Sequence, residues 1–260
     1  MNPQRRSWSQ YAQLIAFTVY VDLKTEIKKM RLGWLWWFLD PVFFISIYSL
    51  VFTVFLDTKT PRFIVFLSIG IVFWRWLSTT VHRSCHCIQA QARVMQEISI
   101  PKFIFPITIF LADTCKMLTI FLCLFIFLAF HHIFPTVLWL TLLPNFVCQG
   151  ILILGLSFCC AYLTPFFPDF LRLLPTLLFG WMIMSGVLFN ILTTPVAWVK
   201  KLQYNPMADI LINYRLPLLE QQPPQWGYML YSASVGVLLN VIGILLIWRY
   251  NRRFPGLPQL

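Results

Sequence analysis

Charged residues are scarce in this chain. Only 11% of its 260 residues are Asp, Glu, Lys or Arg, whereas 59% are hydrophobic. A soluble domain of this size cannot bury so much apolar surface, and lipid must cover what remains. The composition therefore excludes a soluble enzyme or binding module and indicates an integral membrane protein.

Three sequence signals are absent. No Gly-x-x-x-x-Gly-Lys-Ser/Thr phosphate loop occurs, so this chain cannot itself be a P-loop ATPase. No nucleophile–base constellation is recognisable, and we expect neither a catalytic residue nor a cofactor. A cleavable signal peptide is not apparent either, because the first apolar residues recur at helical spacing instead of forming a continuous run.

The cysteines and histidines carry little chemistry. Seven Cys are scattered, most of them in apolar stretches, and we interpret them as reduced residues of a cytoplasmic-membrane protein. His82, Cys85 and His86 would share one helix face, but the run lacks a recognised spacing and a fourth ligand. We predict a helix at the membrane edge there and no metal site.

Long apolar stretches define the fold class. Those long enough to cross a bilayer lie near 35–56, 63–81, 104–130, 136–164, 171–191 and 228–249. The sequence therefore predicts an all-α integral membrane protein with six transmembrane helices.

The distribution of Lys and Arg predicts the orientation. With the N-terminus inside, the cytoplasmic segments hold thirteen of these residues and the external segments hold five. Because six spans return the chain to its starting side, both termini are expected in the cytoplasm. The net charge of +11 flanks apolar spans, which favours contact with a membrane surface over contact with nucleic acid.

We expect one transmembrane domain over 1–260. It begins with an interfacial amphipathic helix within 1–34; a cytosolic helix packed on a partner is the alternative. Spans 1–5 occupy 35–191, an external segment 192–227, span 6 228–249 and a cytoplasmic tail 250–260. The external segment is punctuated by proline yet partly apolar, which predicts short re-entrant helices or, alternatively, a folded external cap.

Residues 23–41 carry a family resemblance. They read Leu-Lys-Thr, then basic residues, then Leu-Gly-x-Leu-Trp, and end on Asp40-Pro41. This order resembles the start of the membrane subunit of ABC exporters of surface polysaccharides, the permeases for capsule, O-antigen and teichoic acid. Tyr204-Asn205-Pro206, with Arg215 beyond it, resembles the Asn-Pro and Arg pattern of the same family near the external mouth of its pore.

The resemblance implies partners and a substrate. It implies a homodimer around a central pathway and two copies of a separate cytoplasmic subunit that binds ATP and Mg. The substrate would be a lipid-linked or lipid-capped polysaccharide, and accessory envelope proteins are compatible with this arrangement. A permease for a drug or a lipid is the alternative, followed by a membrane enzyme that acts on lipid-linked glycan.

A polar stretch between the second and third spans has a break at Pro101. In the resembled exporters a coupling helix that contacts the ATPase lies here, although a plain loop would read similarly. The implied coupling residues are Arg93, Gln96, Glu97, Ile98, Ser99, Pro101 and Lys102.

Two further groups of residues could meet the substrate. Cations that could receive an anionic head group are Lys24, Lys28, Lys29, Arg31 and Arg75. Plain topology signalling, or structural pairing of the charges within spans (Asp40, Arg75, Asp113 and Lys116), is the alternative. Aromatic candidates for lining a sugar pathway are Phe38, Phe43, Phe44, Trp74, Trp181 and Phe189, which could equally face lipid or pack inside.

Overall fold

The computed structural model describes residues 8–29, 31–52, 62–90, 101–192 and 199–249. Within these ranges the chain forms helices and turns, with no strand, which confirms the expected all-α class. The long helices are α1 (Trp8–Lys29), α2 (Trp36–Leu50), α3 (Phe63–Ala90), α5 (Ile104–Phe130), α6 (Leu142–Phe166), α7 (Phe170–Met184) and α9 (Trp226–Arg249). The short ones are η1 (Gly33–Leu35), η3 (Val137–Thr141), η4 (Val199–Tyr204), α8 (Pro206–Arg215) and η5 (Leu216–Glu220).

Five segments of the described chain are long and apolar enough to cross a membrane. They are Gly33–Leu50, Phe63–Ala90, Ile104–Phe130, Val137–Phe166 and Trp226–Arg249. The fifth predicted span, 171–191, is the exception, because α7 has only 15 residues. At 1.5 Å per residue α7 measures about 22 Å, less than the ~30 Å of a hydrocarbon core.

The early end of α7 has a local cause. Gly186 has φ +68°, a left-handed conformation that suits glycine and ends a helix. Ser185 precedes it and donates from its hydroxyl to the Trp181 carbonyl at 2.7 Å. The chain therefore leaves the helix at Ser185, seven residues before the predicted start of the external segment at 192.

Helix α3 extends beyond the second predicted span, 63–81. Helix α3 continues to Ala90, and Ser84, Cys85 and Ile88 in its last turns are buried. The run from His82 to His86 is helical, as predicted for a helix at the membrane edge, and Ser84 and Cys85 within it lie against neighbouring helices. At about 42 Å, α3 is longer than the hydrocarbon core, so part of it extends beyond the core.

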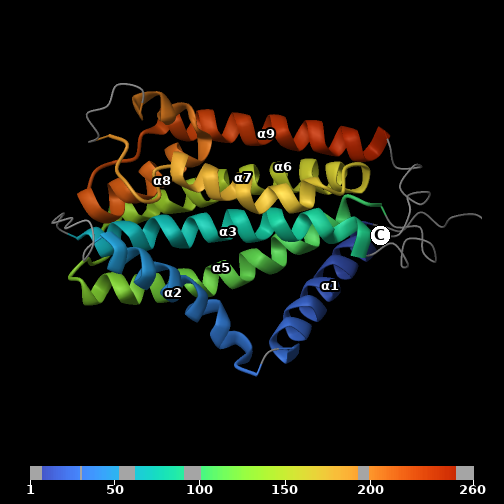
Figure 1. Ribbon diagram of the computed structural model, residues 1–260, viewed down its shortest axis with the longest axis horizontal. Helices are drawn as coiled ribbons and strands as arrows, with labels where there is room; N and C mark the ends of the chain where they lie inside the picture. The colour runs from blue at the N-terminus through green and yellow to red at the C-terminus, as the bar shows by residue number, and fades with distance from the viewer. Residues whose placement is uncertain (1–7, 30, 53–61, 91–100, 193–198, 250–260) are drawn as a thin grey trace, which may run out of the picture.

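Helix α3 lies at the centre of the bundle (Figure 1). It runs between α5 on one side and α6 and α7 on the other, with α9 outside α6. Helices α1 and α2 form a V beside the bundle, with η1 near its tip. The start of α1 and the end of α9 lie at the same end of the molecule.

The tip of the V depends on Gly33, which has φ +52°. A Cβ there would lie 3.3 Å from Cγ2 of Ile27, so a larger residue would be both strained and crowded. The glycine of the Leu-Gly-x-Leu-Trp sequence therefore turns the chain from α1 into α2.

Helices α6 and α9 pack closely through glycine. A Cβ on Gly155 would lie 2.8 Å from Cβ of Leu239, and one on Gly243 would lie 2.5 Å from Cβ of Phe158. Small residues that let helix backbones approach are typical of membrane helix pairs. Asn240 Nδ2 adds a hydrogen bond to the Ile151 carbonyl at 2.7 Å.

Short helices precede the last long helix, as predicted for the segment 192–227. Asn205 caps α8 by accepting from the Met207 amide at 3.1 Å, and Pro206 occupies the first helical position. All of α8 from Met207 to Arg215 is buried against the bundle. Protein therefore covers this short helix. A segment that enters the membrane without crossing it is tolerated only where protein or a water-filled cavity covers it.

Candidate functional site

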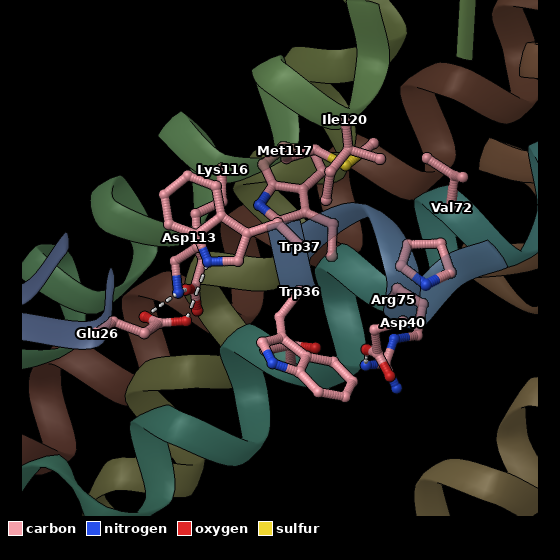
Figure 2. A pocket seen from close by; sticks show the side chains of 13 residues that line it. Glu26, Trp36, Trp37, Asp40, Val72, Arg75, Asp113, Lys116, Met117 and Ile120 are labelled. Carbon is pink, nitrogen blue, oxygen red and sulfur yellow. Dashed lines mark hydrogen bonds and ion pairs between the residues drawn. The ribbon is translucent and has the colours of Figure 1, made fainter. Parts of the chain in front are cut away.

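A cavity of about 340 Å³ opens where α1, α2, α3 and α5 meet (Figure 2). Its lining combines ionised side chains with indole rings. The residues are Glu26, Trp36, Trp37, Asp40, Pro41, Val72, Arg75, Trp76, Thr79, Asp113, Lys116, Met117 and Ile120.

One side of the cavity holds a charged group from α1 and α5. Lys116 Nζ contacts Oε2 of Glu26 at 2.5 Å and Oδ1 of Asp113 at 2.8 Å. Asp113 and Lys116 are buried, and Oδ2 of Asp113 has no hydrogen-bond partner among the described residues. A buried carboxylate oxygen without a donor costs free energy, and this oxygen is itself too buried to be reached from the cavity.

Arg83 of α3 extends this group beyond the cavity. Its guanidinium pairs with Asp113 and with Oδ2 of Asp22, the latter at 2.6 Å, and Glu26 lies 3.9 Å away. The five residues Asp22, Glu26, Arg83, Asp113 and Lys116 make up what we call the α1 anchor. It ties α1, which lies beside the bundle, to α3 and α5.

Asp40 and Arg75 form an ion pair on the other side of the cavity, between α2 and α3. The guanidinium also lies 4.9 Å from the ring centroid of Phe44, within cation–π range. The pairing of Asp40 with Arg75, and of Asp113 with Lys116, is the structural alternative left open by the sequence. The structure brings the pairs together but separates them into two groups.

Trp36 and Trp37 lie between the two charged groups (Figure 2). Nε1 of Trp37 donates to Oε1 of Glu26 at 3.3 Å, and Lys116 Nζ lies 5.9 Å from the Trp37 ring. Trp36 is 40% exposed, so its ring is available to a ligand. Carboxylates can accept hydrogen bonds from hydroxyl groups. The indole faces beside them can pack against the apolar face of a sugar ring.

The remaining predicted head-group cations lie near the tip of the V. Lys24, Lys28 and Lys29 are exposed in the second half of α1, and Arg31 is exposed just after it. Lys24 donates to the Tyr20 hydroxyl at 3.2 Å. These cations are therefore available to a membrane surface, whereas Arg75 is engaged by Asp40.

The six aromatic candidates do not share one surface. Trp74 is 3% exposed and packs edge-on against Trp181, with ring centroids 5.6 Å apart. Phe43 and Phe44 are exposed on α2, and Phe38 packs edge-on against Trp34. Phe189 lies against a small cluster formed by Ile191 and Ala208.

Most of the implied coupling residues (Arg93, Gln96, Glu97, Ile98 and Ser99) lie outside the described residues. Pro101 and Lys102 lie just before α5, where the Pro101 carbonyl accepts from the Ile104 amide at 3.1 Å. Lys102 is 6% exposed, and burial lowers the pKa of its ammonium group.

Sequence reasoning missed Asp22, Glu26 and Arg83. A signal did exist, because Asp22 and Glu26 are four residues apart and share one face of a helix. That spacing indicates a charged stripe, but not which helix it meets. Arg83 lay just beyond the predicted end of the second span, so it was not counted among the charges within spans.

Three named proteins are similar to this chain over most of its length. The chain is 27% identical over 239 residues to the O-antigen export system permease protein RfbA of Myxococcus xanthus, covering 90% of this chain and 91% of that one. It is 23% and 22% identical over 236 residues to two proteins of the same name from Klebsiella pneumoniae, with 90% of each chain covered. No family model matches the chain. The resemblance noted in the sequence is thus confirmed over nearly the whole length.

Proposed function

We propose that this chain is the membrane subunit of an ATP-driven exporter that moves a surface polysaccharide across the cytoplasmic membrane. One observation carries the proposal: the similarity to O-antigen export permeases extends over 90% of the chain. The apolar helices long enough to cross a membrane agree with a multi-pass protein of the inner membrane.

The chain needs a partner to supply energy, because it has no phosphate loop. A separate cytoplasmic subunit would bind ATP and Mg, and two copies of it would act on a homodimer of this chain. Residues 93–102 would transmit its motion. Accessory envelope proteins could receive the polymer outside, and no nucleic acid takes part.

The substrate would approach from the cytoplasmic side, with both termini on that side. Lys24, Lys28, Lys29 and Arg31 are exposed and would hold an anionic head group near the inner leaflet. Aromatic residues on α2 and α7, such as Phe43 and Trp181, would then contact the glycan along its path in the dimer. Aromatic rings suit a sliding polymer because they pack on sugar faces without requiring one hydroxyl pattern.

Deletion of the gene tests the proposal. Surface polysaccharide and lipid-linked glycan retained in the cell are measured in parallel, with a plasmid-borne copy as the control. Loss outside together with accumulation inside is the expected result. An unchanged surface with new sensitivity to drugs or lipids would replace the proposal with the rival permease. Loss outside without accumulation inside would point to a biosynthetic enzyme.

A further inference from the structure

A second cavity adjoins the charged one. It has a volume of about 470 Å³ and lies between α2, α3 and α5. Pro41, Val72 and Ile120 line both cavities. The rest of its lining comes from residues 38–49 of α2, 64–68 of α3 and 123–127 of α5. We call this space the outer cavity.

The outer cavity lies between single faces of three helices. On α3 its lining residues are Ile64, Ser68 and Val72, which follow one another at intervals of four. On α5, Ile120 and Leu124 have the same spacing. Because residues three or four apart share one helix face, each helix presents one continuous face to the space. The cavity is therefore a slot that runs along the helices and not a gap at a loop.

The helix ends give the depth of the slot. On α3 the lining starts at Ile64, just after the helix begins, and on α5 it stops at Phe127, close to where the helix ends. These two helix ends lie together at the end of the molecule opposite to the start of α1 (Figure 1). At 1.5 Å per residue, the lining stays within about 15 Å of them. The outer cavity thus occupies one half of a hydrocarbon core that is about 30 Å thick.

The lining makes no demand for a polar ligand. It contains no Asp, Glu, Lys, Arg or His, and most of it is aliphatic or aromatic. The hydroxyl of Ser68 donates to the Ile64 carbonyl within its own helix at 2.7 Å. Apolar cavities of this kind stay dry and take up apolar molecules. Water is therefore excluded as the occupant, and hydrocarbon fits.

The slot is open to the bilayer. Val42 on α2 and Ile64 on α3 line it and are 52% and 40% exposed, so its rim reaches the surface of the bundle. Protein also covers α2 poorly: 6% of the apolar segment Gly33–Leu50 is buried, against 22–72% of the other four. A hydrocarbon chain could enter from the side and would supply the wall that α2 otherwise lacks.

From this arrangement we propose that the outer cavity binds one acyl chain of a membrane phospholipid, which packs between α2 and α5 and supports α2. The volume falls within the usual range for ligand sites, about 300–1,000 Å³. The depth matches one leaflet, and the phospholipid head then lies at the end of the slot near Ile64 and Phe127. With both termini in the cytoplasm, that leaflet is the outer one. Only this orientation is taken from the proposed function.

Retention of lipid by the purified protein tests the proposal. The full chain, with any subunit that accompanies it, is washed in detergent, and the phospholipid that stays bound is counted by native mass spectrometry and identified after extraction. Ser49→Phe places a ring in the slot, and Ser46→Phe does so at a second position, because both serines line it. Ile47→Phe is the matched control on α2, since Ile47 is 60% exposed and lies outside the lining.

We expect about one phospholipid per chain in the wild type and in Ile47→Phe, and at least fivefold less in both serine variants. No retained lipid in the wild type would overturn the proposal, and so would equal retention in all four proteins. A retained polyprenyl lipid would also overturn it and would assign the slot to the carrier of the exported glycan. None of these results depends on whether polysaccharide is exported, which the deletion strain tests separately.

Thermal unfolding gives an independent measurement that separates filling of the slot from damage to the fold. Palmitoyl-oleoyl phosphatidylethanolamine is added back to the washed proteins. We expect it to raise the unfolding midpoint of the wild type and of Ile47→Phe by several degrees, because a ligand that binds only the folded state stabilises it. In Ser49→Phe and Ser46→Phe the added rings replace the acyl chain, so the lipid should leave their midpoints unchanged. An equal rise in all four proteins would contradict binding in the outer cavity.

Discussion

Arg215 donates from Nη1 to the carbonyl oxygen of Gly186 at 2.7 Å, which fastens the end of α8 to the turn that ends α7. Its Nη2 donates to the Val187 carbonyl at 3.0 Å, and its guanidinium lies 3.5 Å from the ring centroid of Phe66 on α3. The arginine thus joins three segments that are far apart in the sequence. Among the described residues, carbonyl groups and a ring face take the place of a carboxylate partner for this arginine.

Gly70 has no side chain and so leaves space for the Arg215 guanidinium. Gly70→Ala should fill that space. The added Cβ would lie 2.5 Å from Arg215 Nη2 and 3.0 Å from the Val187 carbonyl oxygen. We expect a loss of about 1–3 kcal/mol in stability, the usual cost of overpacking. Thermal unfolding in detergent measures it. Gly180→Ala on α7 is the control, because nothing lies within 4 Å of its added Cβ; equal melting temperatures for both variants would contradict the prediction.

Asn205 should be sensitive to the loss of its amide. Its Oδ1 accepts from the Met207 amide and from Nε1 of Trp181, and its Nδ2 donates to the Ser185 hydroxyl at 2.9 Å. Asn205→Ala removes a helix cap worth about 1 kcal/mol and leaves the indole N–H of Trp181 without its acceptor. We expect a lower unfolding midpoint and a shift in tryptophan fluorescence. Asn205→Asp keeps both accepting contacts, so its unfolding midpoint should lie between those of the wild type and of Asn205→Ala. A midpoint equal to that of Asn205→Ala would refute the role of Oδ1.

The α1 anchor should hold α1 against the bundle. Arg83→Gln removes the cation that joins Asp22 to Asp113, and the buried Asp113 then keeps only Lys116. Losing a partner of a buried charged group costs about 1–3 kcal/mol. Cleavage by trypsin after the exposed Lys28 and Lys29 should therefore be several-fold faster in detergent. Arg172→Gln, on exposed α7 surface, serves as the control; unchanged cleavage in Arg83→Gln would show that the anchor does not hold α1.

Asp209 should make stability depend on pH. It is fully buried on α8, where burial raises the pKa of its carboxyl group to about 7, and it accepts a hydrogen bond from the Ser232 hydroxyl at 3.4 Å. Because the folded state holds the proton more tightly than the unfolded chain, stability is highest below pH 4 for this group and falls as pH rises toward 7. The loss is at most about 4 kcal/mol for a shift of this size. Asp209→Asn should weaken the dependence of the unfolding midpoint on pH between pH 4 and 7. An unaltered pH dependence would refute this role of Asp209.

The coupling prediction concerns the polar stretch before α5. Glu97→Ala combined with Pro101→Ala should leave the protein in the membrane and the partner ATPase active, while surface polysaccharide falls at least tenfold. The ratio of ATP hydrolysed to glycan exported is the quantity to measure. Lys201→Ala, an exposed residue of η4, is the control. Export at the wild-type ratio in the double variant would count against coupling through this segment.

Composition and periodicity determined the class of this protein. An apolar fraction of 59% with 11% charge requires lipid, and in lipid the chain must satisfy its backbone hydrogen bonds internally, so helices follow. The helical spacing of the first apolar residues predicted a separate helix before the first apolar span. These are local properties, which a sequence states directly.

The tertiary structure decided which charges meet and where helices end. Nothing in the sequence shows that Asp22 and Glu26 of α1 reach Arg83 and Lys116, because each partner lies on a different helix and at least 57 residues away. The extension of α3 to Ala90 likewise depends on neighbouring helices that cover its polar end. Pairing across helices is set by their packing, and packing is a property of the whole bundle.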